Sequence, residues 1–478
     1  FTILLALLAI VAVITVIVSG TSGGAVTAAR LSDFCTAPIL GFADALPVCL
    51  FVMILGGFLG MMTETGALDN GIAVLVQKLK GNEIMLVPVL MLIFSLGGTT
   101  YGMCEETVPF YALLAATMMA AGFDPMVGAA TVLLGAGCGC LGSTVNPFAV
   151  GAAVDALTGV GIEVNQSIII GLGAVLWIVT TAMSIVFVMN YAKKVKADKG
   201  STILSMQELK DAEEAHGKAA SEVHKEVKLT GRQKGVLIAF AFTFVVMIVG
   251  FIPLADLNEG VANFFDAGAV YDADGNAVVQ GWSALITGLP IGQWYFDEAS
   301  TWFFLMAVLI GIIGGLSEKQ IVNTFITGAA DMMSVVLVIA LARGISVLMA
   351  NTGLDVFVLD AAANALAGLS GVIFAPMSFL VYFGLSFLIP STSGMATVSM
   401  PIMGPLAVKL GFSPEVMVMI FSAAIGVVNL FTPTSGAIMG GLALAKIEWT
   451  TWLKFALKLI VALSVVCAVI LTVACVLL

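Results

Sequence analysis

Two adjacent carboxylates, Glu105 and Glu106, lie in a stretch of the chain that is otherwise largely apolar. The run "IMLVPVLMLIFSL" precedes them and the run "ALLAATMMAAG" follows them. A carboxylate in such surroundings either has a cation nearby or takes up a proton, so the pair predicts a site for a positive charge or for a proton. Neighbouring residues of a helix diverge by about 100°. We therefore expect at most one of the two to face a pocket, and the other to pair with Lys or Arg or to hold a proton.

Polar and helix-breaking residues interrupt the apolar runs at four places, "SLGGTTYG" (95–102), "GSTVNPF" (142–148), "IPSTSG" (389–394) and "NLFTPTSG" (429–436). Inside a bilayer, non-helical backbone is tolerated only where it is buried in protein or lines a cavity. One such break could be a kink or a packing site, but four in matched positions favour a pocket that collects helix N-termini. We expect tips at 96–101 and 389–394 to meet 143–147 and 431–436. The polar residues predicted to line the pocket are Thr99, Thr100, Asn146, Ser391, Thr392, Ser393, Thr432, Thr434 and Ser435.

Arg343 also lies within an apolar span, where arginine is rare and usually faces a partner or a cavity. It is a candidate ligand for the pocket, and the alternatives of snorkelling or a structural ion pair stay open. Both histidines lie in one charged segment at a spacing unusual for metal ligands, and the seven cysteines lie mostly in apolar runs. A zinc site or a disulfide framework is therefore not expected.

The composition predicts an all-α protein that crosses a membrane many times. Only 10% of the 478 residues are charged and 60% are hydrophobic, whereas a soluble domain has about 25% charged residues. Residues 2–19, 45–63, 166–190, 235–254, 301–316, 331–350 and 455–478 form apolar runs long enough to be candidate spans. We expect residues 2–19 to be a retained span and not a cleaved signal peptide.

The distribution of charge predicts the orientation. Segment 191–234 holds ten Lys or Arg against seven acids, whereas segment 255–300 holds seven acids and no Lys or Arg. The positive-inside rule assigns residues 193–234 to the cytoplasm, as a solvated linker, and residues 255–300 to the extracytoplasmic side, with a turn at "DADGNA". The single span 235–254 joins them, which agrees with opposite sides.

The chain repeats its signals about 290 residues apart. "TETGALDNG" (63–71) corresponds to "ANTGLDVFV" (350–358), and "YGMCEETVPFY" (101–111) to "SGMATVSMPIM" (393–403). An odd number of spans between the two copies would place the second copy in the membrane with the opposite orientation. We therefore expect an inverted repeat of residues 1–192 and 301–478, with two re-entrant hairpins and two broken helices. Many secondary transporters have this pattern. Segments 235–300 connect the halves, and 66–80 and 353–368 are expected to lie along the membrane surfaces. The Glu pair occurs in the first copy only, which suggests that it serves a ligand and not the fold.

The motifs "GMCEETVPFY", "GAGCGCLGSTVNPF", "STSGMATVSMP" and "FTPTSG" resemble those of the C4-dicarboxylate anaerobic carrier (DcuC) superfamily, most closely its YfcC branch, which includes proposed arginine/ornithine antiporters. The resemblance covers about residues 46–452. It implies the ion transporter superfamily fold, a homodimer in the bacterial inner membrane, and an elevator-like movement of a transport domain against a scaffold. Sodium sites in that fold use backbone carbonyls and Asn, Ser or Thr side chains at hairpin tips, so the resemblance makes Asn146, Ser393 and Thr432 candidate sodium ligands.

These observations together predict a secondary transporter or exchanger of small organic solutes and not an enzyme. We favour a basic or zwitterionic amino acid such as arginine or ornithine, because a dicarboxylate would meet two Glu with one intramembrane Arg. A C4-dicarboxylate or another small carboxylate, with or without sodium, is the alternative. A channel is disfavoured by the repeat, an enzyme by the absence of a nucleophile or metal motif, and direct use of ATP by the absence of a P-loop. Partners are the small solute and the lipid bilayer, with no nucleic acid.

Overall fold

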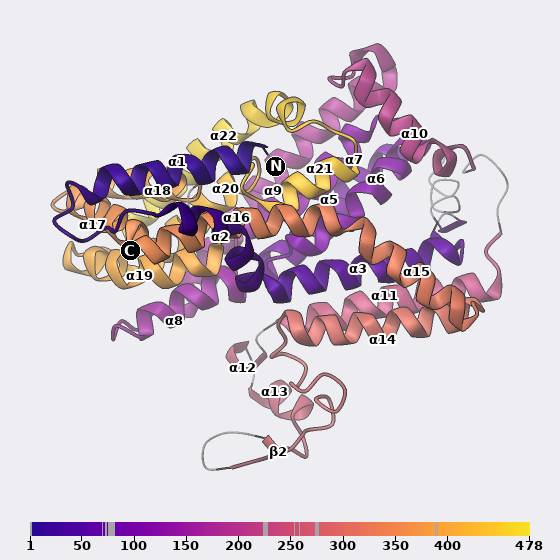
Figure 1. The fold of residues 1–478 in the computed structure, drawn as a ribbon, viewed down its shortest axis with the longest axis horizontal. Helices are drawn as coiled ribbons and strands as arrows, with labels where there is room; N and C mark the ends of the chain where they lie inside the picture. The colour runs from indigo at the N-terminus through magenta and orange to yellow at the C-terminus, as the bar shows by residue number, and fades with distance from the viewer. Residues whose placement is uncertain are drawn as a thin grey trace.

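The structure is a computed structural model that describes residues 2–68, 70–71, 74, 82–222, 228–252, 254–257, 259–272, 277–387, 389 and 391–478. Nearly all of its regular elements are helices (Figure 1). Within this part of the chain, eight helices are long and apolar enough to cross a membrane. They are α1 (Thr2–Ser19), α3 (Leu46–Glu64), η1 with α5 (Glu83–Tyr101), α9 (Gln166–Ala197), α11 (Gly231–Phe251), α14 (Phe296–Gly314), α16 (Met333–Thr352) and α22 (Trp449–Leu477). The prediction of a polytopic helical protein is confirmed.

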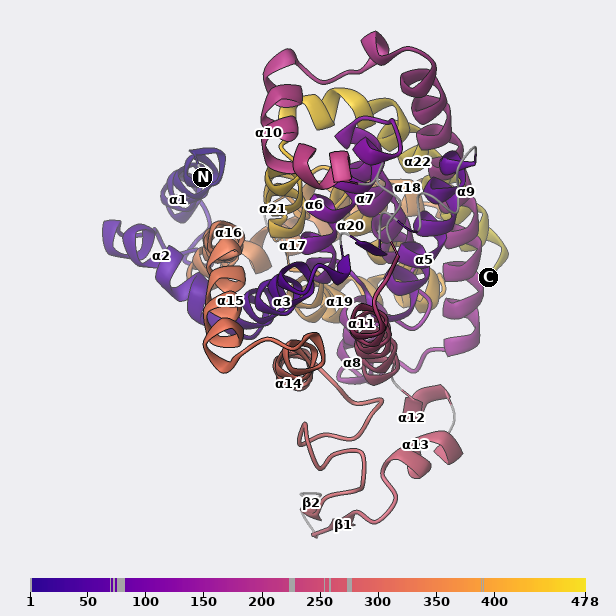
Figure 2. The same ribbon diagram turned by 90° about the vertical axis from the view of Figure 1, so that its right-hand side faces the viewer.

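One group of helices forms a flank of the molecule, clear in Figure 2. It contains α1, α2 (Leu31–Asp44), α3, α14, α15 (Glu318–Asp331) and α16. Helix α2 packs on α16, and α15 packs on α3. Aromatic side chains join α3 to α11 and α14. Phe58 of α3 contacts Phe240 and Phe244 of α11 and Phe303 of α14.

The second group is built from two helical hairpins and two interrupted helices. Hairpin 1 is α5 (Leu86–Tyr101) with α6 (Val108–Ala120), and hairpin 2 is α18 (Gly371–Leu385) with α19 (Thr392–Lys409). Interrupted helix 1 runs from α7 (Pro125–Leu141) to the π-helix η3 (Pro147–Gly151) and α8 (Ala152–Thr158). Interrupted helix 2 runs from α20 (Pro414–Val428) to α21 (Gly436–Leu444).

The two hairpins make corresponding contacts with their neighbours. Helix α5 contacts α7 and α9, while α18 contacts α20 and α22; helix α6 contacts α21, while α19 contacts α8. Helix α20 is buried along its length from Glu415 to Val428, so it forms the centre of this group. Helix α17 (Leu354–Leu366) leads from α16 to hairpin 2 and lies within the expected segment 353–368. Most of the matching segment, 69 and 72–81 apart from residue 74, lies outside the described residues.

Helix α5 approaches α7 at backbone distance. A Cβ on Gly98 would lie 2.2 Å from the carbonyl oxygen of Ala136, and one on Gly139 would lie 2.1 Å from that of Ser95. The two glycines therefore let the helices touch without side chains between them. This contact fixes the end of hairpin 1 against the interruption of α7.

The expected linker contains a docked helix, α10 (Met206–Glu222), and not only a solvated spacer. Helix α10 packs on α6, and Glu208 accepts a hydrogen bond of 2.9 Å from the backbone N–H of Glu448, the N-cap of α22. Nε2 of His216 lies 3.1 Å from the carbonyl oxygen of Leu444, the last residue of α21. The mixed charge of the segment had suggested full solvation, but Leu204 and Ala212 provide a buried face.

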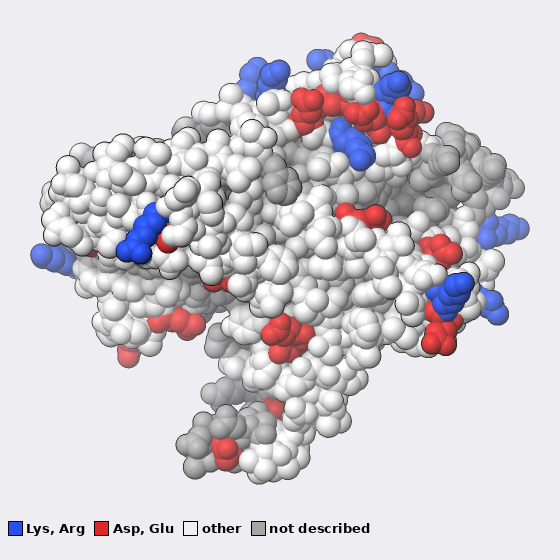
Figure 3. Space-filling view, viewed as in Figure 1, with Lys and Arg blue, Asp and Glu red and all other residues white. Residues whose placement is uncertain are grey.

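Helix α11 is followed in the chain by a segment that lies outside the helical body (Figure 1). It contains α12 (Leu254–Leu257), α13 (Glu259–Phe265) and two short strands. Strands β1 (Val270–Tyr271) and β2 (Ala277–Val279) pair antiparallel, with Val270 opposite Val279. Residues 273–276 of the expected turn lie outside the described part. Figure 3 shows charged side chains gathered over α10, whereas the broad face over α16 and α18 is mainly uncharged.

Candidate functional site

A cavity of about 170 Å³ lies where the hairpin ends meet the interruptions of α7 and α20. Its walls also include residues of α3, α14 and α16, so both groups of helices contribute to it. Of the residues predicted from the sequence, those that line it are Glu105, Glu106, Asn146, Arg343, Ser391, Thr392, Ser393, Thr434 and Ser435.

Three predicted residues lie outside the lining. Thr99 is buried and its hydroxyl donates to the carbonyl oxygen of Gly142 at 2.6 Å, which ties hairpin 1 to the interruption of α7. The hydroxyl of Thr100 donates within its own helix, to Leu96, at 2.7 Å. Thr432 is fully buried and its hydroxyl lies 2.7 Å from that of Thr434. These hydroxyls serve local structure.

The end of hairpin 1 lies a few residues later than the expected 96–101. Helix α5 continues to Tyr101 and ends at Gly102, whose φ of 78° is left-handed. A Cβ at this position would also lie 2.5 Å from Oδ1 of Asn146, so glycine is required for space as well as for conformation. Residues 102–104 then form the connection that presents the two glutamates in the 3₁₀ turn η2 (Glu105–Thr107).

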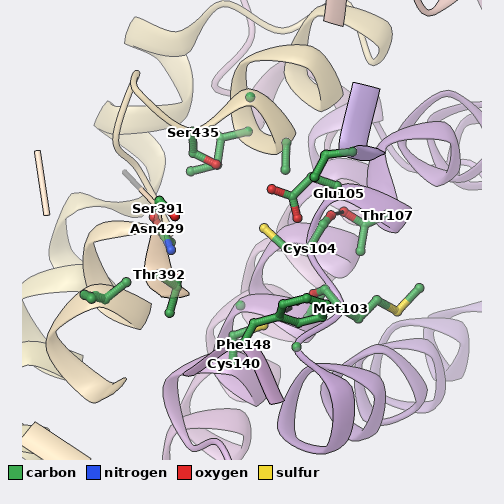
Figure 4. Close-up of a pocket in the computed structure, with 18 of the residues that line it drawn as sticks. Met103, Cys104, Glu105, Thr107, Cys140, Phe148, Ser391, Thr392, Asn429 and Ser435 are labelled. Carbon is green, nitrogen blue, oxygen red and sulfur yellow. Dashed lines mark hydrogen bonds between the residues drawn. The ribbon is translucent and has the colours of Figure 1, made fainter. Parts of the chain in front are cut away.

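The two glutamates differ in burial and in bonding. Glu106 is 1% exposed, and its carboxylate accepts a 3.0 Å hydrogen bond from the backbone N–H of Cys104. Glu105 is half-buried, and Figure 4 shows its carboxylate directed into the space bounded by Ser391, Asn429 and Ser435. The cavity therefore receives the carboxylate of Glu105 directly, while Glu106 closes its own turn.

Arg343 reaches the cavity from α16, but it already has a partner. Its Nε lies 2.8 Å from Oδ2 of Asp44, the last residue of α2. The side chain of Arg343 is 25% exposed and that of Asp44 is 52% exposed. The guanidinium is thus neutralised by an acid of its own group of helices.

Helix N-termini face the cavity from the opposite side. Ser391 is the N-cap of α19, and Ser435 is the N-cap of α21. The hydroxyl of Ser391 accepts a hydrogen bond from Gly394, whereas the side chain of Ser435 makes no capping bond. Free N–H groups and positive dipole ends favour a negatively charged group there. The cavity therefore has an acidic side at Glu105 and an anion-attracting side at α19 and α21.

The side chain of Asn146 is largely occupied by local bonds. Its Oδ1 accepts from the backbone N–H of Phe148 at 2.9 Å and of Ala149 at 3.3 Å, and its Nδ2 donates to the hydroxyl of Ser143 at 2.9 Å. This amide caps η3, the π-helix after the interruption. Of the candidate sodium ligands, Asn146 and Ser393 line the cavity and Thr432 does not.

Several lining residues were missed by the sequence analysis. Asn429, Cys104, Cys140 and Phe148 are visible in Figure 4, and Phe296 completes this wall. The rings of Phe148 and Phe296 stack with centroids 5.4 Å apart. Asn429 begins the second polar interruption, a signal that could have identified it, whereas no sequence signal marks Phe296, which lies within segment 255–300.

Among the residues that the structure describes, no group of three or more His, Cys, Asp or Glu is arranged to hold a metal ion. All seven cysteines are free thiols. His216 contacts the backbone of α21, as described above, and His224 lies outside the described residues.

Two solved transporters resemble the fold distantly. One is the YdaH transporter of Alcanivorax borkumensis, with 16% identity, a TM-score of 0.46 and coverage of 93% of this chain and 88% of that chain. The other is MtrF of Neisseria gonorrhoeae, described as one of a class of antimetabolite efflux pumps, with 17% identity, a TM-score of 0.46 and coverage of 99% and 95%.

Two relatives match by sequence over most of the chain. An uncharacterised protein of Haemophilus influenzae is 29% identical over 445 residues, which is 93% of this chain and 78% of the relative. YfcC of Escherichia coli K12, named as a proposed basic amino acid antiporter, is 27% identical over 440 residues, or 90% and 77%. The family model described as C4-dicarboxylate anaerobic carrier matches residues 1–476. The chain therefore belongs to the DcuC family of membrane transporters.

Proposed function

We propose that this transporter exchanges basic or zwitterionic amino acids, arginine or ornithine being the favoured substrates, across the bacterial inner membrane. The observation that carries the proposal is the polarity of the cavity. Glu105 lies on one side, and the N-termini of α19 and α21 lie on the other. A zwitterion matches both sides at once, with its ammonium at Glu105 and its carboxylate at the helix N-termini.

The charge balance supports a cationic group on the substrate. The positive charge of Arg343 is largely balanced by Asp44, and Glu105 forms no salt bridge with any residue that the structure describes. A carboxylate in a desolvated cavity is stable in its charged form when a cation approaches it. The name of the Escherichia coli relative, a proposed basic amino acid antiporter, agrees with this assignment.

For movement, we propose an elevator mechanism in a homodimer. The hairpins and interrupted helices would form the transport domain, and α1–α3 with α14–α16 would form the scaffold. The matched packing of α2 on α16 and of α15 on α3 supports an inverted repeat of residues 1–192 and 301–478, separated by the linker 193–234 and the connecting segment 235–300. The cavity lies between these two groups of helices, where substrate would be carried.

A C4-dicarboxylate is the second candidate. Arg343 in the cavity wall and the description of the matching family favour it. It would require Arg343 to exchange its bond with Asp44 for a bond with the substrate, or it would require accompanying cations.

The test uses proteoliposomes loaded with unlabelled solute and supplied with labelled arginine, ornithine or succinate. We expect arginine and ornithine to exchange, Glu105→Gln to reduce this exchange strongly, and Glu106→Gln to reduce it less, because Glu106 is bonded to its own turn. Glu64→Gln, on an exposed residue at the end of α3, is the matched control. Transport of succinate without arginine or ornithine, or full arginine exchange in both cavity variants, would refute the amino-acid assignment. The same vesicles with and without a Na⁺ gradient decide whether transport is coupled to sodium, for which Asn146 and Ser393 are the candidate ligands that line the cavity.

A further inference from the structure

The ion pair between Asp44 and Arg343 lies at the edge of the cavity. Arg343 lines the cavity wall and so does Ala45, the residue after Asp44, whereas Asp44 itself does not. Arg343 therefore contributes to the cavity wall, while the acid that pairs with it lies outside the lining. Asp44 ends α2, and only Ala45 separates α2 from α3. Asp44 therefore lies at the junction of two helices and not in the middle of one.

Backbone contact between α2 and α16 fixes this pair. A Cβ on Gly41 would lie 2.3 Å from the carbonyl oxygen of Ala340 and 2.3 Å from the backbone nitrogen of Gly344. Gly344 directly follows Arg343, and Gly41 precedes Asp44 by three residues, which places Gly41 and Asp44 on one side of α2. The crossing point of the two helices therefore sets the positions of the acid and the base.

The charge of Arg343 would act more strongly on the cavity if Asp44 were absent. Arg343 and Glu105 line the same cavity, and the ion pair with Asp44 weakens the attraction between their charges. In a site with a low effective dielectric constant, an unpaired guanidinium binds the nearest carboxylate. That carboxylate would belong to Glu105 or to the substrate. In either case the site would lose its preference for a cation.

We propose that Asp44 is the positioning residue that determines the charge specificity of the transporter. By holding Arg343 in an ion pair, Asp44 leaves Glu105 available to the positive group of the substrate. The proposal rests on the proposed function and adds a determinant that lies outside the cavity lining. It predicts that the net charge of the pair Asp44–Arg343, and not either side chain alone, controls the choice between cationic and anionic substrates.

The experiment measures KM and maximal rate for arginine exchange and for succinate exchange in proteoliposomes. Asp44→Asn is expected to raise the arginine KM at least tenfold, which corresponds to about 1.4 kcal/mol, and to lower the succinate KM. Asp44→Glu is expected to restore most of the arginine affinity. Asp331→Asn is the matched control, because Asp331 is an exposed acid that ends α15 as Asp44 ends α2. It is expected to leave both KM values unchanged.

The double variant Asp44→Asn/Arg343→Gln separates charge control from folding. Because it removes both charges, we expect it to return the arginine KM to within about threefold of wild type, well short of the tenfold change expected for a loss of 1.4 kcal/mol. Arg343→Gln alone leaves the pair with a negative charge, so it is expected to lower the arginine KM and to raise the succinate KM, and this variant serves if Asp44→Asn does not fold. An unchanged arginine KM in Asp44→Asn, an unrescued double variant, or a tenfold increase in Arg343→Gln would each overturn the proposal.

The outcomes separate this proposal from the proposed function. If the wild type exchanges arginine and Asp44→Asn does so with unchanged KM, the amino-acid assignment stands and the role of Asp44 is wrong. If the wild type moves only succinate, the amino-acid assignment fails. The charge argument is then supported by a lower succinate KM in Asp44→Asn and overturned by an unchanged one.

Discussion

Gly139→Ala should separate hairpin 1 from α7, because the added carbon meets backbone atoms only. Its Cβ would lie 2.1 Å from the carbonyl oxygen of Ser95, 2.8 Å from Cα of Gly98 and 2.8 Å from the backbone nitrogen of Thr99. Ordinary contact begins near 3.4 Å, so α5 must move by about 1 Å in a tightly packed interior. Overpacking of this kind costs about 1–3 kcal/mol.

Gly171→Ala is the matched control on α9, where nothing lies within 4 Å of an added Cβ. In an exposed helix the same substitution stabilises by about 0.5–1 kcal/mol. Gly139 also lies within a helix and has the same gain, so the two variants should differ by the overpacking cost of about 1–3 kcal/mol. Heating in detergent followed by size-exclusion chromatography compares them, and we expect Gly139→Ala to be lost at clearly lower temperature and to transport more slowly. Equal or greater thermal stability of Gly139→Ala would show that the close contact of α5 and α7 is not as tight as described.

Two further predictions concern buried hydrogen bonds. The indole of Trp452 donates to the carbonyl oxygen of Leu430 at 2.9 Å, so Trp452→Phe should cost about 1–3 kcal/mol, whereas Trp177→Phe should cost less because the buried Trp177 indole N–H has no hydrogen-bond partner among the described residues. Melting of both variants in detergent checks this, and equal losses would contradict it. Burial alone would raise the pKa of Glu208, but backbone N–H groups of Glu448 and Ser205 donate to it and bring the pKa below its usual value. The ionised carboxylate therefore stabilises the docking of α10 at neutral pH, and this stabilisation should be lost as the pH falls through the lowered pKa and the carboxylate takes up a proton. Glu208→Gln should increase hydrogen exchange in α10 at neutral pH, whereas Glu213→Gln on the exposed face of α10 should not; equal exchange in both would refute the role of Glu208.

The long apolar spans could be predicted from the sequence because burial in lipid requires uninterrupted apolar runs. Helix α2 escaped prediction, since "LSDFCTAPILGFAD" contains polar residues and Pro38. Without α2, the partner of Arg343 could not be identified, because Asp44 comes from the other half of the chain. Long-range ion pairs of this kind depend on helix crossings that no local pattern records.

Local hydrogen bonds explain the differences at the polar interruptions. Thr100 had suggested a break, but its hydroxyl bonds to Leu96 in its own helix and α5 continues to Tyr101. Thr432 had suggested a ligand, but its hydroxyl pairs with Thr434. Ser391 and Ser435 do line the cavity, because they are the N-caps of helices that point toward it. Whether these residues bind substrate stays a prediction.

The docking of α10 also sets a length limit on any movement of the molecule. Helix α10 contacts α6 and is bonded to the ends of α21 and α22, whereas the next helix, α11, packs on α14. Residues 223–230 are the only chain between α10 and α11. Eight residues reach at most roughly 30 Å when fully extended. The number of residues therefore sets an upper limit on the separation of α10 and α11, and under the proposed elevator mechanism a shorter connection would limit how far the hairpin group could move relative to α11 and α14.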